Sequence, residues 1–229
     1  FIKISGSSPY ESPTDMGVNM AGYCITDDDA VCEASKQEII RRYYAARCLL
    51  RQGLSERAEV YRLELLMKQL EISAGDRPVI DAAIARSIST NGPAVAIQLH
   101  DGRIITGKTT ALLGASAALL LNVLKELGGI HHDIHLISPI VIEPIQVLKT
   151  KHMGNNNPRL HTDEILIALS ICAATNPTAA LAMQQLSRLK GCEAHSTVIL
   201  SRVDENVFQK LGINITCEPQ YQTKKLYHH

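Results

Sequence analysis

The spacing of apolar residues divides the chain into a helical first part and a mixed second part. Residues 1–25 are rich in proline, glycine and small polar residues, which is typical of a loop. Across residues 26–92 the apolar positions return every three or four residues, which predicts three helices, with helix ends at Gly53 and Asn91. We expect Thr26 to cap the first of them. The second helix carries one apolar stripe, formed by Val60, Leu63, Met67 and Leu70.

Residues 93–229 alternate between short β-type runs and helical runs. Runs rich in β-branched residues predict strands at 94–99, 103–106, 134–138, 195–200 and 213–217. Helices are expected between them at 109–127, 162–174, 177–190 and 204–211. Asp101 and Gly102 form a hairpin turn signal between the first two strands. This order predicts an α/β fold in which a helical subdomain precedes a layered, mostly parallel sheet with one hairpin.

Ligands in layered α/β sheets bind beyond the carboxyl ends of the strands. Polar residues that follow a predicted strand or precede a predicted helix are therefore the first candidates for a site. These residues include Lys108, Ser138, Ser201 and Glu218.

Composition narrows the classes of function. The 23 basic and 23 acidic residues balance, tryptophan is absent and aromatic residues make up 4%, so we expect no nucleic-acid partner. The longest apolar run, residues 111–121, is shorter than the roughly 20 residues that span a bilayer, so we expect no membrane partner either. Six scattered cysteines without a C-x-x-C pair predict reduced thiols and a cytoplasmic location.

The run from Gly102 to Thr109 matches the spacing G-x-x-x-x-G-K-[ST] of a phosphate-binding loop. Its interior, residues 104–106, is β-branched and favours an extended strand over a loop that wraps an anion. We therefore interpret the run as a hairpin strand that leads into a helix. Lys108 and Thr109, at the N-terminus of that helix, are still candidates for holding one phosphate or carboxylate. The alternative is a capped helix with a solvated lysine.

A second candidate is the polar loop before the helix predicted at 162–174. Asn157, Arg159 and His161 bring an amide, a guanidinium and an imidazole to a helix N-terminus, where an anion can be held. The alternative is a structural loop in which Thr162 caps the helix. Both interpretations stay open on the sequence.

Two further clusters contain residues that can carry chemistry. His131, His132 and Asp133 resemble metal ligands, but the sequence has no H-E-x-x-H signature and no fourth ligand nearby, so we predict a polar turn and no metal. Cys192 and His195 can pair as a thiol and its base, but no third group that would orient the base is evident.

Six runs along the chain resemble one bacterial family. They are SPYESPTDMGVNMAG at 8–22, TGKTTALLGASAALLLN at 106–122, HLISP at 135–139, NPRLHTDEILIALSICAATNP at 157–177, GCEAHSTVILS at 191–201 and LGINITCEPQYQTKKLYH at 211–228. On these runs the chain is identified as a member of the family labelled domain of unknown function 1846, also called uncharacterised protein family 0371. The resemblance covers nearly the whole chain. It departs at His131 and His132, where acidic residues are usual, and this departure further disfavours a metal site.

The resemblance implies that family members are about twice as long as this chain. The chain is then expected to be a C-terminal half, with a missing N-terminal half upstream of Ser8 as its partner. That half is expected to carry a glycine-rich phosphate loop of the type GPGSGK and to bind ATP or another nucleotide. Residues 1–25 would be a polar linker from it. The family's catalytic residues are not established, so the resemblance assigns none.

Two hypotheses about function follow. In the first, the chain supplies the substrate side of a nucleotide-dependent transferase, ligase or hydrolase, with Asp15 or His195 as acid or base and an anionic small molecule as ligand. Its binding residues would be Ser12, Thr14, Asn19, Lys108, Thr109, Asn157, Arg159 and His161. In the second, it is a non-enzymatic assembly or regulatory domain whose helices, residues 27–90, form a homo-oligomer interface.

Geometry separates the two hypotheses. An enzyme requires the loops 12–19, 157–161 and 195–201 to meet in one cleft. An assembly domain does not, because its polar loops only cap helices.

Overall fold

The computed structural model describes residues 27–222 and begins with a helical region. Its helices are α2 (Asp28–Gln52), α3 (Arg57–Gln69) and α4 (Val79–Thr90), with a short 3₁₀ turn (Ala74–Asp76) before the last. The Asp27 side chain caps α2 by accepting a backbone N–H at 2.9 Å, whereas Thr26, the predicted cap, lies outside the described residues. Gly53 and Asn91 end α2 and α4 in left-handed conformations, at the predicted positions.

The four described strands form one sheet with the order β2-β1-β3-β4. They are β1 (Ala94–Gln98), β2 (Ile104–Lys108), β3 (Glu193–Ser196) and β4 (Asn214–Cys217). β1 runs antiparallel to both β2 and β3, and of the described pairs only β3 and β4 are parallel. The α/β class, the helical region ahead of the sheet and the hairpin of β1 and β2 are confirmed. The sheet is mixed, however, and not mostly parallel.

The strand predicted at 134–138 does not form in the described sheet, which removes an expected parallel strand. These residues are irregular and end where Pro139 begins α6 (Pro139–Val147). Leu136 and Ile137 are neighbours and both are buried, at 2% and 4% exposure. Two adjacent apolar side chains therefore enter the core from a loop.

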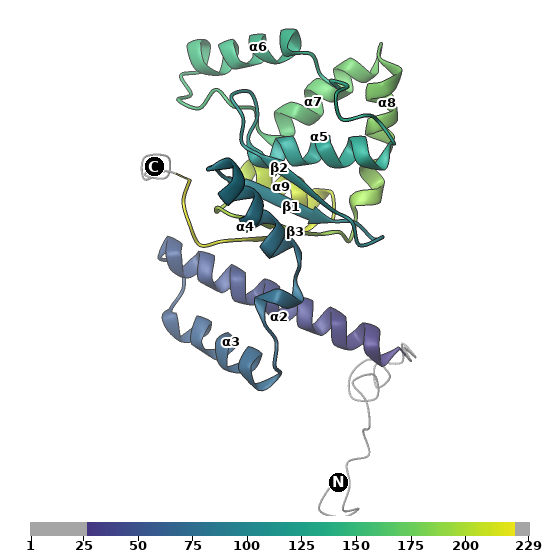
Figure 1. Ribbon diagram of the computed structural model, residues 1–229. Coiled ribbons are helices and arrows are strands. Elements are labelled where there is room, and N and C mark those ends of the chain that lie inside the picture. Colours follow the sequence, from purple (N-terminus) through teal and green to yellow (C-terminus); the bar gives the residue numbers. More distant parts are fainter. Residues whose placement is uncertain (1–26, 223–229) are drawn as a thin grey trace, which may run out of the picture.

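Helices cover both faces of the sheet (Figure 1). One face is covered by α5 (Ala115–Leu127), α7 (Thr162–Ala173), α8 (Pro177–Gln184), its 3₁₀ continuation (Leu186–Leu189) and α9 (Arg202–Lys210). Val95 of β1 and Ala194 of β3 belong to their core. On the other face Val79 and Ala83 of α4 pack against Ala96. Successive residues of β1 thus enter different cores, as the pleat of a strand requires.

The run that resembles a phosphate loop is a hairpin strand, as predicted. Gly102 occupies the turn with a φ of 85°, and Gly107 lies within β2. A Cβ on Gly107 would lie 2.3 Å from the Leu119 backbone nitrogen, so close packing of β2 against α5 requires glycine. The helix predicted to begin directly after this strand begins later. α5 begins at Ala115 and not at residue 109, because the Thr110 hydroxyl accepts two backbone N–H groups of an intervening turn.

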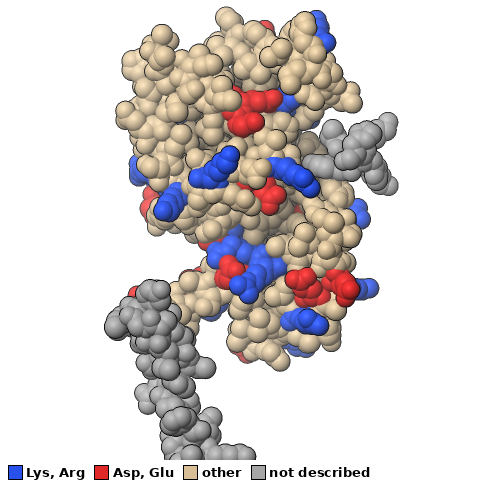
Figure 2. All heavy atoms as spheres, turned by 180° about the vertical axis from the view of Figure 1, so that it is seen from behind, with Lys and Arg blue, Asp and Glu red and all other residues tan. Residues whose placement is uncertain are grey.

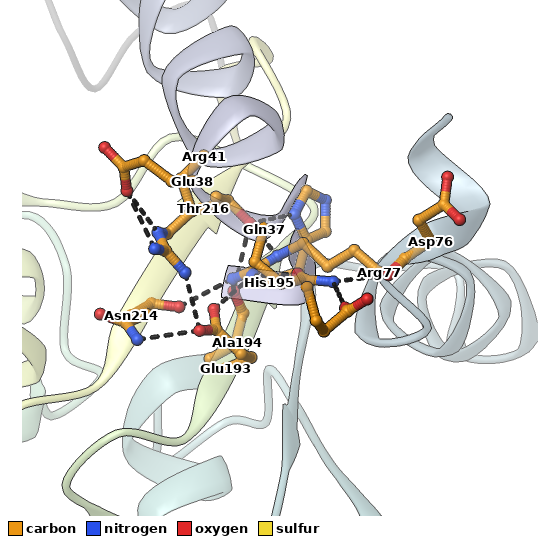
Figure 3. Close-up of polar contacts among 11 residues, drawn as sticks. Gln37, Glu38, Arg41, Asp76, Arg77, Glu193, Ala194, His195, Asn214 and Thr216 are labelled. Carbon is orange, nitrogen blue, oxygen red and sulfur yellow. Dashed lines mark hydrogen bonds and ion pairs between the residues drawn. The ribbon is translucent and has the colours of Figure 1, made fainter. Parts of the chain in front are cut away.

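A buried arginine joins the helical region to the sheet (Figure 3). Arg77 is 1% exposed and donates to the carbonyl oxygens of Ala194 and Asn214, each at 2.8 Å. Its guanidinium also pairs with Glu193, the first residue of β3, and Arg41 of α2 reaches the same carboxylate at 2.8 Å. A buried charge is tolerated only when it is paired and hydrogen-bonded, so this network holds α2 against the sheet.

The surface carries charges of both signs. On the face shown in Figure 2, Lys and Arg side chains are interspersed with Asp and Glu side chains and do not form one basic surface. No helix within residues 27–222 has the length and apolar character needed to cross a membrane.

Candidate functional site

One edge of the sheet surrounds a cleft of about 220 Å³. Because β1 is antiparallel to its neighbours, β2, β3 and β4 all end at this edge and β1 begins there. The N-terminal ends of α5, α7 and α9 meet at the same place. The cleft is lined by residues that include Thr109, Gly114, Ser116, Asn157, Arg159, His161, Ser196, Ser201 and Asp204. Its location is the one expected for a ligand in an α/β sheet.

The N-terminus of α5 opens into the cleft without a cap. Its N-cap residue is Gly114, which has no side chain, and no side chain among the described residues caps the first turn. Free N–H groups and the positive end of the helix dipole therefore face the cleft. In α7 and α9, by contrast, Asp204 and Ser201 accept N–H groups of the first turn. Of these three helices, α5 is the one whose first-turn N–H groups have no side-chain acceptor among the described residues, as an anion site requires.

Arg159 brings a guanidinium to the same cleft. Its Nε donates to the Thr110 carbonyl oxygen at 2.8 Å, which directs the side chain along the segment before α5. Neither Nη1 nor Nη2 has a hydrogen-bond or ion-pair partner among residues 27–222. A partly exposed arginine with unused donors, beside an uncapped helix N-terminus, suits a phosphate or a carboxylate.

The loop that carries Arg159 is held by contacts on two sides. The Leu160 N–H donates to the Leu112 carbonyl at 3.0 Å, and the Leu160 carbonyl accepts from Gly114 at 3.1 Å. Lys149, 5% exposed in a π-helical turn (Leu148–His152), donates to the Arg159 carbonyl at 2.7 Å and to a carboxylate of α7 at 2.8 Å. A loop ordered in advance loses less conformational entropy when a ligand binds.

An imidazole and a carboxylate form a hydrogen-bonded pair in the cleft. His161 Nδ1 lies 3.1 Å from Asp204 Oδ2, although the two residues are 43 positions apart in the chain. The carboxylate also accepts from the Thr162 N–H at 3.0 Å, the Thr162 hydroxyl at 2.9 Å and the Ser201 hydroxyl at 2.9 Å. These bonds orient the imidazole and leave its Nε2 without a hydrogen bond to any described residue.

The pair changes the protonation of both partners. The hydrogen bond to Asp204 raises the pKa of His161, against the opposing effect of burial. Burial alone would raise the pKa of Asp204, but the hydrogen bond and charge of His161, together with the bonds from Thr162 and Ser201, lower it. An imidazole held by a carboxylate in this way can serve as a proton donor or acceptor. The cleft therefore combines groups suited to holding an anion with a group suited to general acid or base chemistry.

The structure brings together part of the predicted anion-binding set. The members that line the cleft are Thr109, Asn157, Arg159 and His161. Lys108 does not line it, because it is exposed at the end of β2 and precedes a turn and not a helix. The members that lie outside the described residues are Ser12, Thr14, Asp15 and Asn19. Two of the three loops of the enzyme hypothesis thus meet in one cleft, and the third is outside the described part of the chain.

His195, the predicted catalytic histidine, faces the other side of the sheet. It is 0% exposed, and its ring packs against Tyr44 of α2 with the ring centroids 5.0 Å apart. Nδ1 lies 2.8 Å from Thr216 Oγ1, and Nε2 lies 3.5 Å from the Glu218 carboxylate. Burial lowers the pKa of His195. The next residue, Ser196, lines the cleft instead, because successive side chains of a strand point to opposite faces.

The two other candidate clusters lie away from the cleft. Cys192 Sγ lies 3.8 Å from His100 Nε2 and does not pair with His195, and burial raises the pKa of its thiol. A nucleophilic thiolate is therefore not favoured there. Residues 131–133 form an exposed turn, as predicted, with potential ligand atoms within 4.8 Å of one another.

Two features of the cleft had no predicted role, Asp204 and the uncapped Gly114. Ser201 and Asp204 have the spacing [ST]-x-x-[DE] of a capping box, which is a recognisable sign of a helix start. This spacing predicts the beginning of α9, but it does not predict that the Asp204 carboxylate also accepts hydrogen bonds from α7. Gly114 offers no local signal beyond the glycine itself.

Comparisons with known proteins identify one family. The family model described as "Domain of unknown function DUF1846, C-terminal" matches residues 75–227, and the N-terminal model of the same family matches residues 1–71. A UPF0371 protein of Corynebacterium efficiens is 54% identical over 224 residues, which are 98% of this chain and 45% of the relative. A UPF0371 protein of Streptococcus thermophilus is 54% identical over 225 residues, which are 98% of this chain and 46% of the relative.

The chain spans about half the length of these curated relatives. It nevertheless matches both family domains, so the expectation that it holds only a C-terminal half is wrong. The two matched ranges meet between residues 71 and 75, inside the helical region predicted at 26–92, where the apolar spacing marks no boundary. On the two domain matches and the close relatives, the chain belongs to the family of domain of unknown function DUF1846.

Proposed function

We propose that this chain forms the substrate side of the active site in a nucleotide-dependent transferase, ligase or hydrolase. The observation that carries the proposal is the cleft at the sheet edge, where Arg159, the uncapped N-terminus of α5 and the His161–Asp204 pair meet. The anionic group of the substrate, a phosphate or a carboxylate, would lie between the Arg159 guanidinium and the first turn of α5.

The imidazole of His161 is the proposed acid–base group. Asp204 holds Nδ1 and favours the protonated ring, so Nε2 is the atom that would exchange a proton with the substrate. Thr162 and Ser201 hold the carboxylate in place and would act as positioning residues. His195 is less suited to this role in the cleft, because its ring is buried on the other face of the sheet.

We place the nucleotide, ATP or a related one, in the part of the longer relatives that this chain does not span. The family resemblance implies a glycine-rich phosphate loop there, and the two parts would close on one substrate. We also propose a cytoplasmic location, because the five cysteines that the structure describes are all free. The proposal involves no nucleic acid and no membrane.

Replacing Arg159 with glutamine is expected to weaken the binding of an anionic ligand by about tenfold, because two charge-assisted donors are lost. A thermal-shift screen of the 229-residue chain with inorganic phosphate, carboxylates and phosphorylated metabolites identifies a ligand, since binding raises the unfolding midpoint by mass action. Titration calorimetry then compares the affinities of wild type and Arg159→Gln.

Lys108→Gln is the matched control, because it removes a nearby charge that does not line the cleft. Equal losses in the two variants would indicate a general charge effect and refute the site. Unchanged affinity in Arg159→Gln would refute it as well. The nucleotide is tested separately on a full-length relative, and the absence of a thermal shift with any nucleotide there would remove it from the proposal.

A second candidate function, a homo-oligomer interface on residues 27–90, is favoured by apolar side chains on the surface of α3. Leu65, Leu66 and Leu70 are 42%, 37% and 52% exposed, respectively. Val60 and Met67 of the predicted stripe are buried, whereas Leu70, the last member of the stripe, is exposed. An interface would remove this apolar surface from water.

Size-exclusion chromatography with light scattering tests the interface. Wild type is expected to form a dimer or a larger oligomer, and the double variant Leu66→Lys, Leu70→Lys is expected to be monomeric. Ile171→Lys is the control, because Ile171 is 65% exposed on α7, outside the proposed interface. A monomeric wild type at high micromolar concentration would rule this function out.

A further inference from the structure

A second cavity, between α2 and α3, is lined by three arginines and has a volume of about 550 Å³. Arg47 and Arg51 come from α2, and Arg57 comes from α3, with the ring of Tyr61 beside it in the lining. This arginine groove shares no lining residue with the cleft at the sheet edge. It is therefore a separate place on the molecule.

Helix geometry brings the guanidiniums to one groove. Arg47 and Arg51 are four residues apart, as are Arg57 and Tyr61, so each pair lies on one face of its helix. Gly53 ends α2 in a left-handed conformation with a φ of 76°, and α3 begins at Arg57. The short connection makes the two helices neighbours and turns these faces toward the same groove.

Only one of the three arginines has an ion-pair partner among residues 27–222. Arg47 forms an ion pair with the Glu218 carboxylate at 3.9 Å, and its guanidinium is held over two tyrosine rings of α2. Arg51 is held over the Tyr221 ring at 5.5 Å. Arg57 has no ion-pair or hydrogen-bond partner within residues 27–222. Stacking on a ring fixes a guanidinium and leaves the donors in its plane for a ligand.

Two other groups determine the net charge of the groove. Glu64 lines it, and its carboxylate accepts a hydrogen bond from the Tyr43 hydroxyl at 3.4 Å. Glu56, the N-cap of α3, provides no side-chain cap, so free N–H groups beside Arg57 add positive potential. Three guanidiniums and a helix N-terminus thus outweigh the lining carboxylate of Glu64 and the carboxylate of Glu218 that pairs with Arg47.

We propose that the arginine groove binds a linear oligophosphate, a ligand with two or three linked phosphate groups. A single phosphate can engage one or two guanidiniums, whereas a di- or triphosphate offers oxygens along its length to all three. The apolar lining residues Leu50 and Val60, with the exposed Tyr61 ring, suit a flat group at one end of the ligand, such as a nucleobase. The groove would bind this ligand whether or not the cleft binds its own substrate.

Titration calorimetry of the 229-residue chain with inorganic tripolyphosphate tests the groove. The titration uses the Arg159→Gln background, so that the cleft contributes little binding. Arg51→Gln and Arg57→Gln are each expected to weaken the affinity at least about fivefold, because each removes charge-assisted donors. Binding is also expected to weaken as NaCl is raised, because the arginines are open to solvent.

Arg62→Gln is the matched control, because Arg62 is exposed on α3 but does not line the groove. Its affinity for tripolyphosphate is expected to be unchanged. A loss as large as that in Arg57→Gln would assign the binding to general surface charge and overturn the proposal. No detectable binding at low salt would overturn it too. Circular-dichroism melts of every variant separate a lost site from a lost fold.

A comparison of the affinities of ATP and tripolyphosphate tests whether the groove also binds a nucleobase. A nucleobase that packs on Leu50 and Val60 would make ATP bind more tightly than tripolyphosphate, and Tyr61→Ala should remove most of that advantage. Equal affinities of ATP and tripolyphosphate would overturn the nucleobase part and leave a site for the phosphate chain alone.

Discussion

Replacing Gly107 with alanine is expected to destabilise the protein by about 3 kcal/mol or more. The added Cβ would lie 2.3 Å from the Leu119 backbone nitrogen and 2.6 Å from the Ala115 carbonyl oxygen. Both atoms belong to the backbone of α5, so no side-chain rotation can relieve the contact. The helix must move away from β2, and the core between them loses packing.

Thermal unfolding followed by circular dichroism measures this loss. For a chain of this size, about 3 kcal/mol corresponds to a fall of roughly 6–12 °C in the unfolding midpoint. Gly92→Ala is the matched control, because the nearest atom to its added Cβ lies 3.8 Å away. Equal midpoints for the two variants would contradict the packing role of Gly107.

The same variant separates two interpretations of the run from Gly102 to Thr109. If Gly107 were the second glycine of a phosphate loop, alanine would impair anion binding and leave the fold intact. Because Gly107 lies in β2 against α5, the expected loss is one of stability. A stable variant that no longer bound anions would restore the phosphate-loop interpretation.

Replacing Asp204 with alanine is expected to lower the free energy of unfolding by about 3–5 kcal/mol, because its carboxylate links α7 to α9. The carboxylate is 12% exposed and accepts hydrogen bonds from Thr162, Ser201 and His161. Its removal leaves the Thr162 N–H and hydroxyl buried without this acceptor. Denaturant titration measures the free energy of unfolding.

The destabilisation by Asp204→Ala is expected to depend on pH. Folding raises the pKa of His161. The His161–Asp204 pair therefore contributes fully to the free energy of unfolding below the ordinary histidine pKa of 6.5, and this contribution is lost as the pH rises through the raised pKa. The pKa of Asp204 is lowered, so its contribution is present above the ordinary value of 3.8 and is lost as the pH falls through the lowered value. The destabilisation caused by Asp204→Ala should therefore be largest between about pH 4 and 6.5 and smaller at about pH 9.

Glu205→Ala is the matched control for Asp204→Ala, because it removes the neighbouring carboxylate of α9, which is exposed. Asp204→Asn keeps the size of the side chain and separates the loss of charge from the loss of shape. A destabilisation no larger than that of Glu205→Ala would contradict the role of Asp204 in joining the helices. A destabilisation that stayed constant from pH 5 to pH 9 would contradict its pairing with a charged His161.

Local patterns in the sequence determined the elements of this protein. Apolar spacing predicted α2, α3 and α4, and the turn at Asp101 and Gly102 predicted the hairpin of β1 and β2. The polar residues at 157–161 also indicated one wall of the cleft, because a guanidinium and an imidazole next to a helix start are visible in the sequence itself. Helix periodicity and turn chemistry depend on interactions within a few residues, so they can be read from the sequence.

Only the tertiary structure decided how these elements are arranged. Residues 134–138 have the composition of a strand but form a loop that leads into α6 at Pro139, and Leu136 and Ile137 are buried in the core. His195 lies under α2 while Ser196 lines the cleft, since helices cover both faces of the sheet. The contact of His161 with Asp204 joins residues 43 positions apart. Such contacts form only when distant segments pack together. The pattern of residues within one segment does not predict them, because the packing energy comes from both segments.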